Sequence, residues 1–392
     1  MRRRSVLYLQ VSVALYSLAA NFAHPIEPAF FQELNLPDYT FGVAFACMAF
    51  ACFLFSPFWG KIAERIGIAK VMAIGYGGYA LGQFFFLQSG NAWEVALARL
   101  FAGFFIAAVM DGQIMYILTV EKAEKTGASL AVMASVSAVF SAFGYLIGGL
   151  IGSRSVRLAI VAQIVGLALI GILVLVFLED QERKTAGGRL SLKTMNPFSS
   201  FVEMSGIMSR MVVLFLAVAL ITSLASNCYD QCFNYFIRDQ YGFEPSMNGI
   251  LKGISGVITL AANATVSVWL LKKTDIFRSI VPVFLVCALM LVGIVVSDAI
   301  VPFVVLNVVL FGFNAIYKPL LQAMIGRLDS GEQGILVGAY NGFNSVGSVI
   351  GSLVAGFTYV ASPRGSFVAA AVCFAAAAIF AVGLRKEYER QE

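Results

Sequence analysis

Long apolar runs separated by short polar breaks extend along almost the whole chain. A helix of roughly 20 apolar residues crosses the hydrocarbon core of a bilayer. Runs of about this length cover 5–31, 41–59, 68–88, 93–119, 129–152 and 157–178, and then 211–237, 246–271, 277–297, 300–326, 334–360 and 365–384. This pattern predicts an all-α membrane protein with twelve transmembrane helices in two six-helix bundles.

The polar stretch 179–210 separates the two sets of runs. It predicts a cytoplasmic linker, with a short amphipathic helix near 197–208, between an N-terminal bundle over 1–178 and a C-terminal bundle over 211–392. The opening Met-Arg-Arg-Arg and the apolar run behind it also resemble a signal peptide. We interpret this segment as the first span, because a related segment recurs inside the chain.

The low content of charged residues narrows the class of protein. Of the 392 residues, 59% are hydrophobic and 12% are charged, whereas a soluble domain carries about 25% charged residues. This composition excludes a soluble protein, and we attribute the net charge of +5 to membrane topology rather than to nucleic-acid binding. All six cysteines lie in apolar runs without CxxC spacing, which indicates packing rather than metal or redox chemistry.

Lysine and arginine are distributed unevenly between the two ends of the expected spans. With the N-terminus inside, most of the 27 basic residues fall in cytoplasmic segments, as the positive-inside rule requires. The outer loops hold Arg154, Arg157, Arg238 and Arg364. We therefore expect an integral protein of a bacterial inner or plasma membrane, with both termini in the cytoplasm.

Two pairs of segments repeat at nearly the same separation. Residues 17–33 (SLAANFAHPIEPAFFQE) match 223–239 (SLASNCYDQCFNYFIRD), and 144–152 (GYLIGGLIG) match 347–355 (GSVIGSLVA). The first pair relates span 1 to span 7 and the second relates span 5 to span 11, so the halves are parallel repeats. Such repeats, related by an axis along the membrane normal, are typical of alternating-access transporters with a substrate site near the midplane. The sequence therefore predicts a central cavity between pseudo-twofold-related bundles.

Polar side chains recur at helical spacing on spans 1, 7 and 10. Residues four apart lie on one helix face, and a polar face against lipid is costly, so these faces should meet protein or a water-filled cavity. The expected substrate-binding residues are Asn21, His24, Asn227, Asp230, Gln231, Asn234, Asn314, Tyr317 and Lys318. The alternative is that these side chains only form hydrogen bonds between helices.

Ionisable residues also fall inside the expected spans, where an unpaired charge costs at least about 2.5–3.5 kcal/mol. They are His24, Glu27, Arg99, Asp111, Asp230 and Lys318. Glu27, Asp111 and Asp230 are candidate proton carriers, since a carboxylate can bind a proton from one side of the membrane and release it to the other. Asp111 and Lys318 lie at similar depth in equivalent spans, and we hypothesise that they pair across the cavity. The alternative is that each bonds a neighbour in its own half.

The loop between spans 2 and 3 carries a family pattern. Its sequence, GKIAERIGIAKVM over 60–72, resembles the signature loop of the major facilitator superfamily, G-x-L-A-D-R-x-G-R-K. Glu64 replaces the family's Asp, and Ile68 and Ala69 stand where two basic residues are usual. The resemblance implies the twelve-helix fold and a gating role for Gly60, Glu64, Arg65 and Gly67.

Three further segments resemble motifs of the twelve-span drug/proton antiporters in this superfamily. LAANFAHPIEP (18–28) is similar to the first-span pattern, and RLFAGFFIAA (99–108) is similar to the R-x-x-x-G motif of span 4. GYLIGG (144–149) resembles the G-P-x-x-G-G motif of span 5, with Tyr145 in place of the proline. The resemblance implies a role for Arg99 in proton transfer.

These features predict a secondary transporter that works by alternating access, with proton-coupled efflux (antiport) of amphipathic or drug-like small molecules as the leading hypothesis. The alternatives are transport of organic anions or metabolites, with Lys318 and Arg99 as counter-charges, and a lipid or lysolipid flippase. An enzyme is not expected, because the single histidine has no evident catalytic partners. The sequence has no GxxxxGK[ST] loop, so ATP is not the expected energy source. The expected partners are the substrate, protons and the bilayer, without cofactor, metal or nucleic acid, and a monomer is expected.

Overall fold

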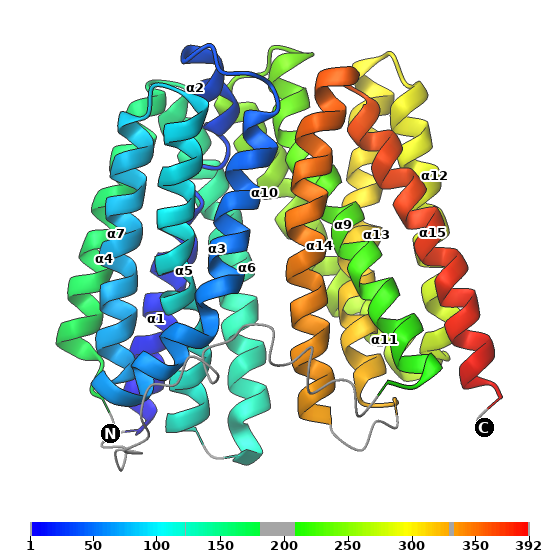
Figure 1. Cartoon of the computed structure of the whole chain (residues 1–392), viewed down its shortest axis with the longest axis horizontal. Helices are drawn as coiled ribbons and strands as arrows, with labels where there is room; N and C mark the ends of the chain where they lie inside the picture. Colours follow the sequence, from blue (N-terminus) through cyan, green and yellow to red (C-terminus); the bar gives the residue numbers. More distant parts are fainter. Residues whose placement is uncertain (1, 122, 181–207, 329–332, 391–392) are drawn as a thin grey trace. The chain divides into compact units, whose positions relative to one another are not determined.

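The computed structural model of the chain describes residues 2–121, 123–180, 208–328 and 333–390, and all regular structure in these ranges is helical (Figure 1). The helices are α1 (Arg2–Ala20), α2 (Glu27–Glu33), α3 (Thr40–Ile66), α4 (Ile68–Gln88), α5 (Ala92–Val120), α6 (Ala123–Gly152), α7 (Val156–Phe177), α9 (Arg210–Asp239), α10 (Pro245–Ala262), the π-helical turn η3 (Asn263–Ser267), α11 (Val268–Lys273), α12 (Ile276–Val296), α13 (Ile300–Ile325), α14 (Gln333–Ala361) and α15 (Gly365–Tyr388).

Among the described residues, ten helical segments are long and apolar enough to cross a membrane. One of them, Pro245–Lys273, combines α10, η3 and α11. The two other expected spans correspond to α1, whose apolar part Ser5–Ala20 is shorter, and to α4. The prediction of an all-α membrane protein is confirmed, and each of the twelve expected spans corresponds to one helix or to consecutive helical segments.

The first expected span is not one continuous helix. α1 ends at Ala20, a turn follows, and α2 begins at Glu27. Pro25 disfavours helical geometry at the residue before it, whereas Pro28 falls in the first turn of α2, where a missing N–H costs little. The break therefore places the polar side chains of this turn at the start of a new helix.

Several of the other helices begin at a capping side chain. Before α5, the Asn91 side chain accepts a hydrogen bond from the backbone N–H of Glu94 at 3.0 Å. Before α7, the Ser155 hydroxyl accepts from the N–H of Leu158 at 3.3 Å. Such caps contribute about 0.5–2 kcal/mol each, and they fix where the short connections end and the long helices start.

The contacts divide the chain into two compact units. The first comprises Met1–Thr40, Cys47–Pro197 and Gly242–Gly256, and the second comprises Phe41–Ala46, Phe198–Tyr241 and Val257–Glu392. α3 and α10 therefore each contribute residues to both units. The expected division into 1–178, 179–210 and 211–392 stays a prediction, since residues 181–207, with most of the helix expected near 197–208, lie outside the described residues.

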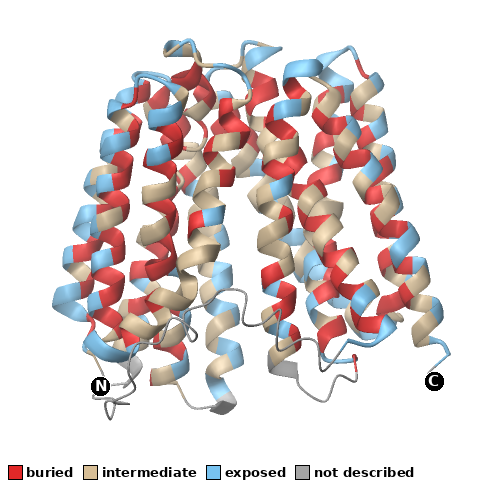
Figure 2. Ribbon diagram, viewed as in Figure 1, coloured by how far each residue is buried: buried red, intermediate tan, exposed pale blue. Residues whose placement is uncertain are grey.

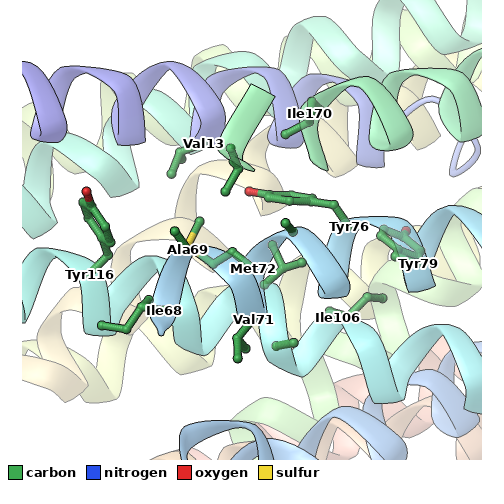
Figure 3. Close-up of a cluster of buried hydrophobic side chains, with 14 of the residues drawn as sticks. Val13, Ile68, Ala69, Val71, Met72, Tyr76, Tyr79, Ile106, Tyr116 and Ile170 are labelled. Carbon is green, nitrogen blue, oxygen red and sulfur yellow. The ribbon is translucent and has the colours of Figure 1, made fainter. Parts of the chain in front are cut away.

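Each unit has its own apolar interior. In the first, α4 packs against α5 and α7 while α1 packs against α6 and α7. Figure 3 shows part of this core, including Val13, Met72, Tyr76, Ile106 and Ile170. In the second unit, α9 packs against α14 and α15, and α12 packs against α13 and α15.

Figure 2 shows exposed residues along the helices of both units, and many of these residues are apolar. On α7, for example, Leu169, Ile172 and Val176 are between 59% and 67% exposed and recur at helical spacing. A stripe of this kind would be unfavourable in water, and it fits a helix face that meets hydrocarbon.

The two repeated segments contact each other within each unit. Gly148 of α6 lies against the backbone of Phe22, so a Cβ at this position would collide with the carbonyl oxygen of Phe22. In the second unit, Gly351 of α14 lies in the same way against the backbone of Leu224 on α9. Small residues let membrane helices approach closely. In each unit, the glycine-bearing segment of the repeat thus packs against the polar segment of the repeat.

Gly148→Ala is expected to destabilise the protein by about 1–3 kcal/mol, because the added methyl group forces α6 away from the break after α1. The measurement is the thermal unfolding midpoint of purified protein in detergent. Gly77→Ala is the matched control, since a Cβ at Gly77 meets nothing within 4 Å and helix propensity alone favours alanine by up to about 1 kcal/mol. Equal midpoints for the two variants would contradict the packing argument.

Candidate functional site

A buried ion pair lies where the first span is broken. Nη2 of Arg99, on α5, is 2.6 Å from Oε1 of Glu27, the first residue of α2. Nδ1 of His24, in the preceding turn, is 3.3 Å from the same carboxylate oxygen. The Arg99 and Glu27 side chains are only 2% and 15% exposed. A single carboxylate oxygen therefore lies between a guanidinium and an imidazole.

Aromatic rings line this pair. The Arg99 guanidinium lies over the ring of Phe86 at 3.9 Å from its centroid, and Phe86 in turn contacts Phe30 of α2 at 4.9 Å between ring centroids. On the other side, the His24 ring stacks on Tyr145 at 5.7 Å. Tyr145 is the residue that replaces the motif proline in α6. Because rings exclude water, the attraction between the two charges is stronger here than at a surface.

The ion pair requires that Glu27 is ionised. Transferring a proton to Glu27 neutralises the carboxylate and removes the charge that holds Arg99. An unpaired buried guanidinium is costly, so its surroundings must respond when Glu27 takes up or releases a proton. The ion pair therefore depends on the charge state of Glu27.

The asparagines of spans 1 and 7 form equivalent interhelical hydrogen bonds. In the first unit, Nδ2 of Asn21 donates to the hydroxyl of Ser141 at 3.1 Å, and in the second unit Nδ2 of Asn227 donates to the hydroxyl of Ser348 at 2.9 Å. The contacts join the turn after α1 to α6, and α9 to α14. They are the type of contact that the alternative interpretation of the polar stripes expects, and a substrate-binding role for Asn21 and Asn227 stays a prediction.

The second unit brings together part of the predicted set. Asn314 exchanges hydrogen bonds with the hydroxyl of Ser226 at 3.1 and 3.2 Å, and the buried Tyr317 hydroxyl lies beside the same serine. Asp230 has electrostatic contacts with Tyr229 and Tyr317.

The remaining predicted residues of this unit vary in exposure. Gln231 and Asn234 are half-buried, the Oδ1 atom of Asn234 is without a hydrogen-bond partner, and Lys318 is exposed. Lys318 also lies close enough to Tyr340 of α14 to interact electrostatically with it.

Asp111 lies on α5, farther along the helix than Arg99. It is half-buried and lies beside Ser56 and Cys52 of α3. Its Oδ2 atom makes no hydrogen bond. Asp111 belongs to the first unit and Lys318 to the second, and their pairing stays a prediction.

The predicted gating residues surround the junction of α3 and α4. Gly67 separates the two helices with φ of 103°, a conformation that favours glycine. Glu64 is partly exposed and forms an ion pair with Lys61 at 3.1 Å, Arg65 is exposed, and a Cβ on Gly60 would meet nothing within 4 Å.

The sequence analysis missed the carboxylate that binds this junction. Oδ1 of Asp180, just beyond α7, accepts a hydrogen bond from the backbone N–H of Ala69 at 2.7 Å. Asp180 therefore caps the N-terminus of α4, where a negative charge is favoured. In the sequence, Asp180 belongs to an acidic pair, Glu179 and Asp180, that directly follows the sixth apolar run. Nothing in the sequence indicates which group this pair contacts.

Long apolar helices in two units, an internal sequence repeat and a charged pair buried among aromatic rings are typical of a polytopic membrane transporter. The family model "Major Facilitator Superfamily" matches residues 9–316. The chain belongs to the major facilitator superfamily, and it is a secondary transporter rather than an enzyme.

Relatives and solved structures agree with this assignment. The chain is 21% identical over 355 residues to the quinolone resistance protein NorA of Staphylococcus aureus, covering 90% of this chain and 89% of that protein. It is 20% identical over 343 residues to multidrug resistance protein 2 of Bacillus subtilis, covering 86% and 84%. The crystal structure of a bacterial homolog of the human lysosomal transporter Spinster matches with a TM-score of 0.77 at 12% identity, over 99% of this chain and 98% of that one.

Arg99→Met is expected to destabilise the protein by about 3–5 kcal/mol, because it leaves the Glu27 carboxylate buried without its partner. The double variant Arg99→Met/Glu27→Gln removes both charges and should recover most of this loss. Thermal unfolding in detergent measures both. Lys61→Met, which breaks the half-exposed pair with Glu64, serves as the control and should cost only about 0–1 kcal/mol. A double variant no more stable than Arg99→Met would refute a direct pair.

Proposed function

We propose that the protein is a proton-coupled exporter of amphipathic or drug-like small molecules. The observation that carries the proposal is the buried ion pair of Glu27 and Arg99, with His24 on the same carboxylate oxygen. The relatives named for quinolone and multidrug resistance support the choice of substrate class and of export.

In the proposed cycle, Glu27 carries the proton. When Glu27 is charged it holds Arg99 of α5 against the α1–α2 break. When it is protonated the attraction is lost, and His24 is placed to deliver or accept the proton through the shared oxygen. Because the break connects α1 to α2, a change in the pair alters how these elements pack, which is the step that alternating access requires.

The other predicted residues enter the proposal at different points. Asp111 and Asp230 are the further candidate proton carriers, and the polar residues of α9 and α13 are the candidate substrate contacts. The α3–α4 junction is the candidate gate. We propose that both termini lie in the cytoplasm of a bacterial membrane, which the distribution of basic residues supports.

Glu27→Gln is expected to lower the rate of proton-driven export by at least about tenfold, while the rate of substrate exchange stays unchanged. A glutamine cannot release a proton, yet exchange of substrate across the bilayer needs no net proton transfer. The measurement uses proteoliposomes with an imposed pH gradient, a fluorescent quinolone and ethidium as probes, and an internal pH dye. Counterflow of labelled probe without a gradient measures exchange.

The matched control for this experiment is Glu33→Gln. Glu33 ends the same helix, α2, and is exposed, so its loss should leave both activities unchanged. Wild-type protein that moves neither probe with or against a proton gradient would defeat the proposed coupling, as would a Glu27→Gln variant with normal gradient-driven export.

A second candidate function is transport of organic anions. One observation favours it, namely that Lys318 is exposed on α13 within an apolar helix, beside Tyr317. The other counter-charge of that hypothesis, Arg99, is already neutralised by Glu27. We therefore place this candidate second.

Lys318→Met separates the two candidates. If the substrate is a cationic or neutral amphiphile, the variant should export ethidium at least as well as the wild type, because a like charge has been removed. If the substrate is an organic anion, binding should weaken by at least about tenfold, since a charge-assisted contact is lost. Probe binding to the purified protein, followed by fluorescence anisotropy, distinguishes these outcomes, and Lys318→Arg, which keeps the charge, is the control.

A further inference from the structure

The interior of the first unit contains buried polar atoms that the ion pair does not account for. Nε and Nη1 of Arg99 make no hydrogen bond, although the side chain is 2% exposed. Gln83 and Gln163 are each fully buried, and the Oε1 atom of Gln163 is also without a partner. The amide atoms of Gln83 have no partner at full hydrogen-bonding geometry, and the Tyr79 hydroxyl is the polar group beside them. Most buried polar groups in proteins are hydrogen-bonded, to protein or to water.

These atoms gather around one tyrosine. The hydroxyl of Tyr79 accepts a hydrogen bond from Nε2 of Gln163 at 3.2 Å, and it lies beside Gln83 and within electrostatic range of Arg99 and Glu27. Gln83 lies one turn beyond Tyr79 on α4, on the same helix face. Nε2 of Gln163, on α7, also donates to the carbonyl of Ala20 at 2.8 Å, where α1 ends.

We propose that these side chains form a buried water-binding site next to the Glu27–Arg99 pair, which we call the chamber. The polar groups that would hold the water belong to Tyr79 and Gln83 of α4, Arg99 of α5 and Gln163 of α7. The unpartnered atoms include donors on Arg99 and Gln83 and acceptors on Gln83 and Gln163. A buried water commonly makes about three hydrogen bonds, and these atoms suffice for about two waters.

Charge favours water over an anion as the ligand. The guanidinium is already matched by Glu27 at 2.6 Å, so the chamber carries no net positive charge while Glu27 is ionised. An anion would also meet the amide oxygens of Gln83 and Gln163, which repel it. Water, which both donates and accepts, satisfies every group named.

The chamber gives Arg99 an alternative set of partners. When Glu27 takes up a proton, the guanidinium loses its counter-charge, and in a dry site it would then be buried alone. Waters held by Gln83, Gln163 and Tyr79 can solvate it at that moment. The chamber therefore makes the protonated state of Glu27 accessible, and this functional part of the inference rests on the proposed proton coupling.

Hydroxyl-radical labelling tests the chamber directly, because radicals formed from bound water by a synchrotron X-ray pulse oxidise only adjacent side chains. Tyr79 and Tyr76 lie one turn apart on α4 (Figure 3), are 2% and 0% exposed, and fall on the same tryptic peptide between Lys70 and Arg99. Tandem mass spectrometry of the full-length protein in nanodiscs should show Tyr79 oxidised at least fivefold faster than Tyr76. Equal rates for the two tyrosines, whether low or high, would overturn the chamber.

Gln83→Leu supplies an independent measurement whose sign separates the two cases. If the site holds water, the leucine removes its partners, and the unfolding midpoint should fall by several degrees with slower oxidation of Tyr79. If the site is dry, replacing an unsatisfied buried amide by leucine should raise the midpoint, and that result would overturn the inference. Gln88→Leu, at an exposed position of the same helix, is the control and should change neither quantity.

Two further outcomes keep the inference distinct from the proposed function. A midpoint that rises with chloride and not with gluconate would identify an anion site and overturn the assignment to water. Faster oxidation of Tyr79 in a protein that moves no protons would support the chamber while the proposed coupling fails, because neither measurement requires transport.

Discussion

A charge inside a membrane protein has to be matched where it lies, since no bulk water is present to solvate it. Arg99 meets this constraint through Glu27 and through the face of Phe86. For Glu27 to reach α5, the first span has to stop after Ala20 and restart at the carboxylate, which Pro25 and Pro28 enforce. The ion pair thus forms because the first span is broken.

The same break depends on close packing nearby. α6 approaches the end of α1 through Gly148, next to Phe22, and it presents Tyr145 to the ring of His24 one turn earlier. The glycine motif therefore does more than bring two helices together, because it sets the distance at which the aromatic wall of the ion pair forms. The equivalent contact in the second unit, Gly351 against Leu224, lacks the two prolines and accompanies a continuous helix, α9. The two halves share this packing mode. They differ in that the helix is broken in the first half and continuous in the second.

Most of the fold could be predicted from the sequence, because hydrophobic length alone determines how many helices can cross a bilayer. The family motifs also drew attention to Arg99 and to the segment that contains Glu27. That these two residues pair could not be predicted, since it depends on where a helix ends. Asp180 is a similar case, as its partner, the N–H of Ala69, lies 111 residues away. Gln83 and Gln163 gave no signal because each is a single polar residue within an apolar run, and only the fold brings them to one tyrosine.

These features together give a reason for a transporter to keep polar groups without protein partners inside a bundle. A pair that is perfectly matched in one protonation state is held so firmly that losing one charge costs several kcal/mol, and such a site resists the change that transport requires. In the proposed proton cycle, adaptable partners of Arg99, namely amides, a hydroxyl and water, would reduce the free-energy difference between the charged and the protonated state of Glu27. If Arg99 were surrounded only by apolar groups such as Phe86, the state with Glu27 charged would always be strongly favoured over the protonated state. The arrangement around Arg99 combines both, with one rigid aromatic face and one polar face, and this asymmetry is what would allow a buried carboxylate to change its protonation state without unfolding the bundle around it.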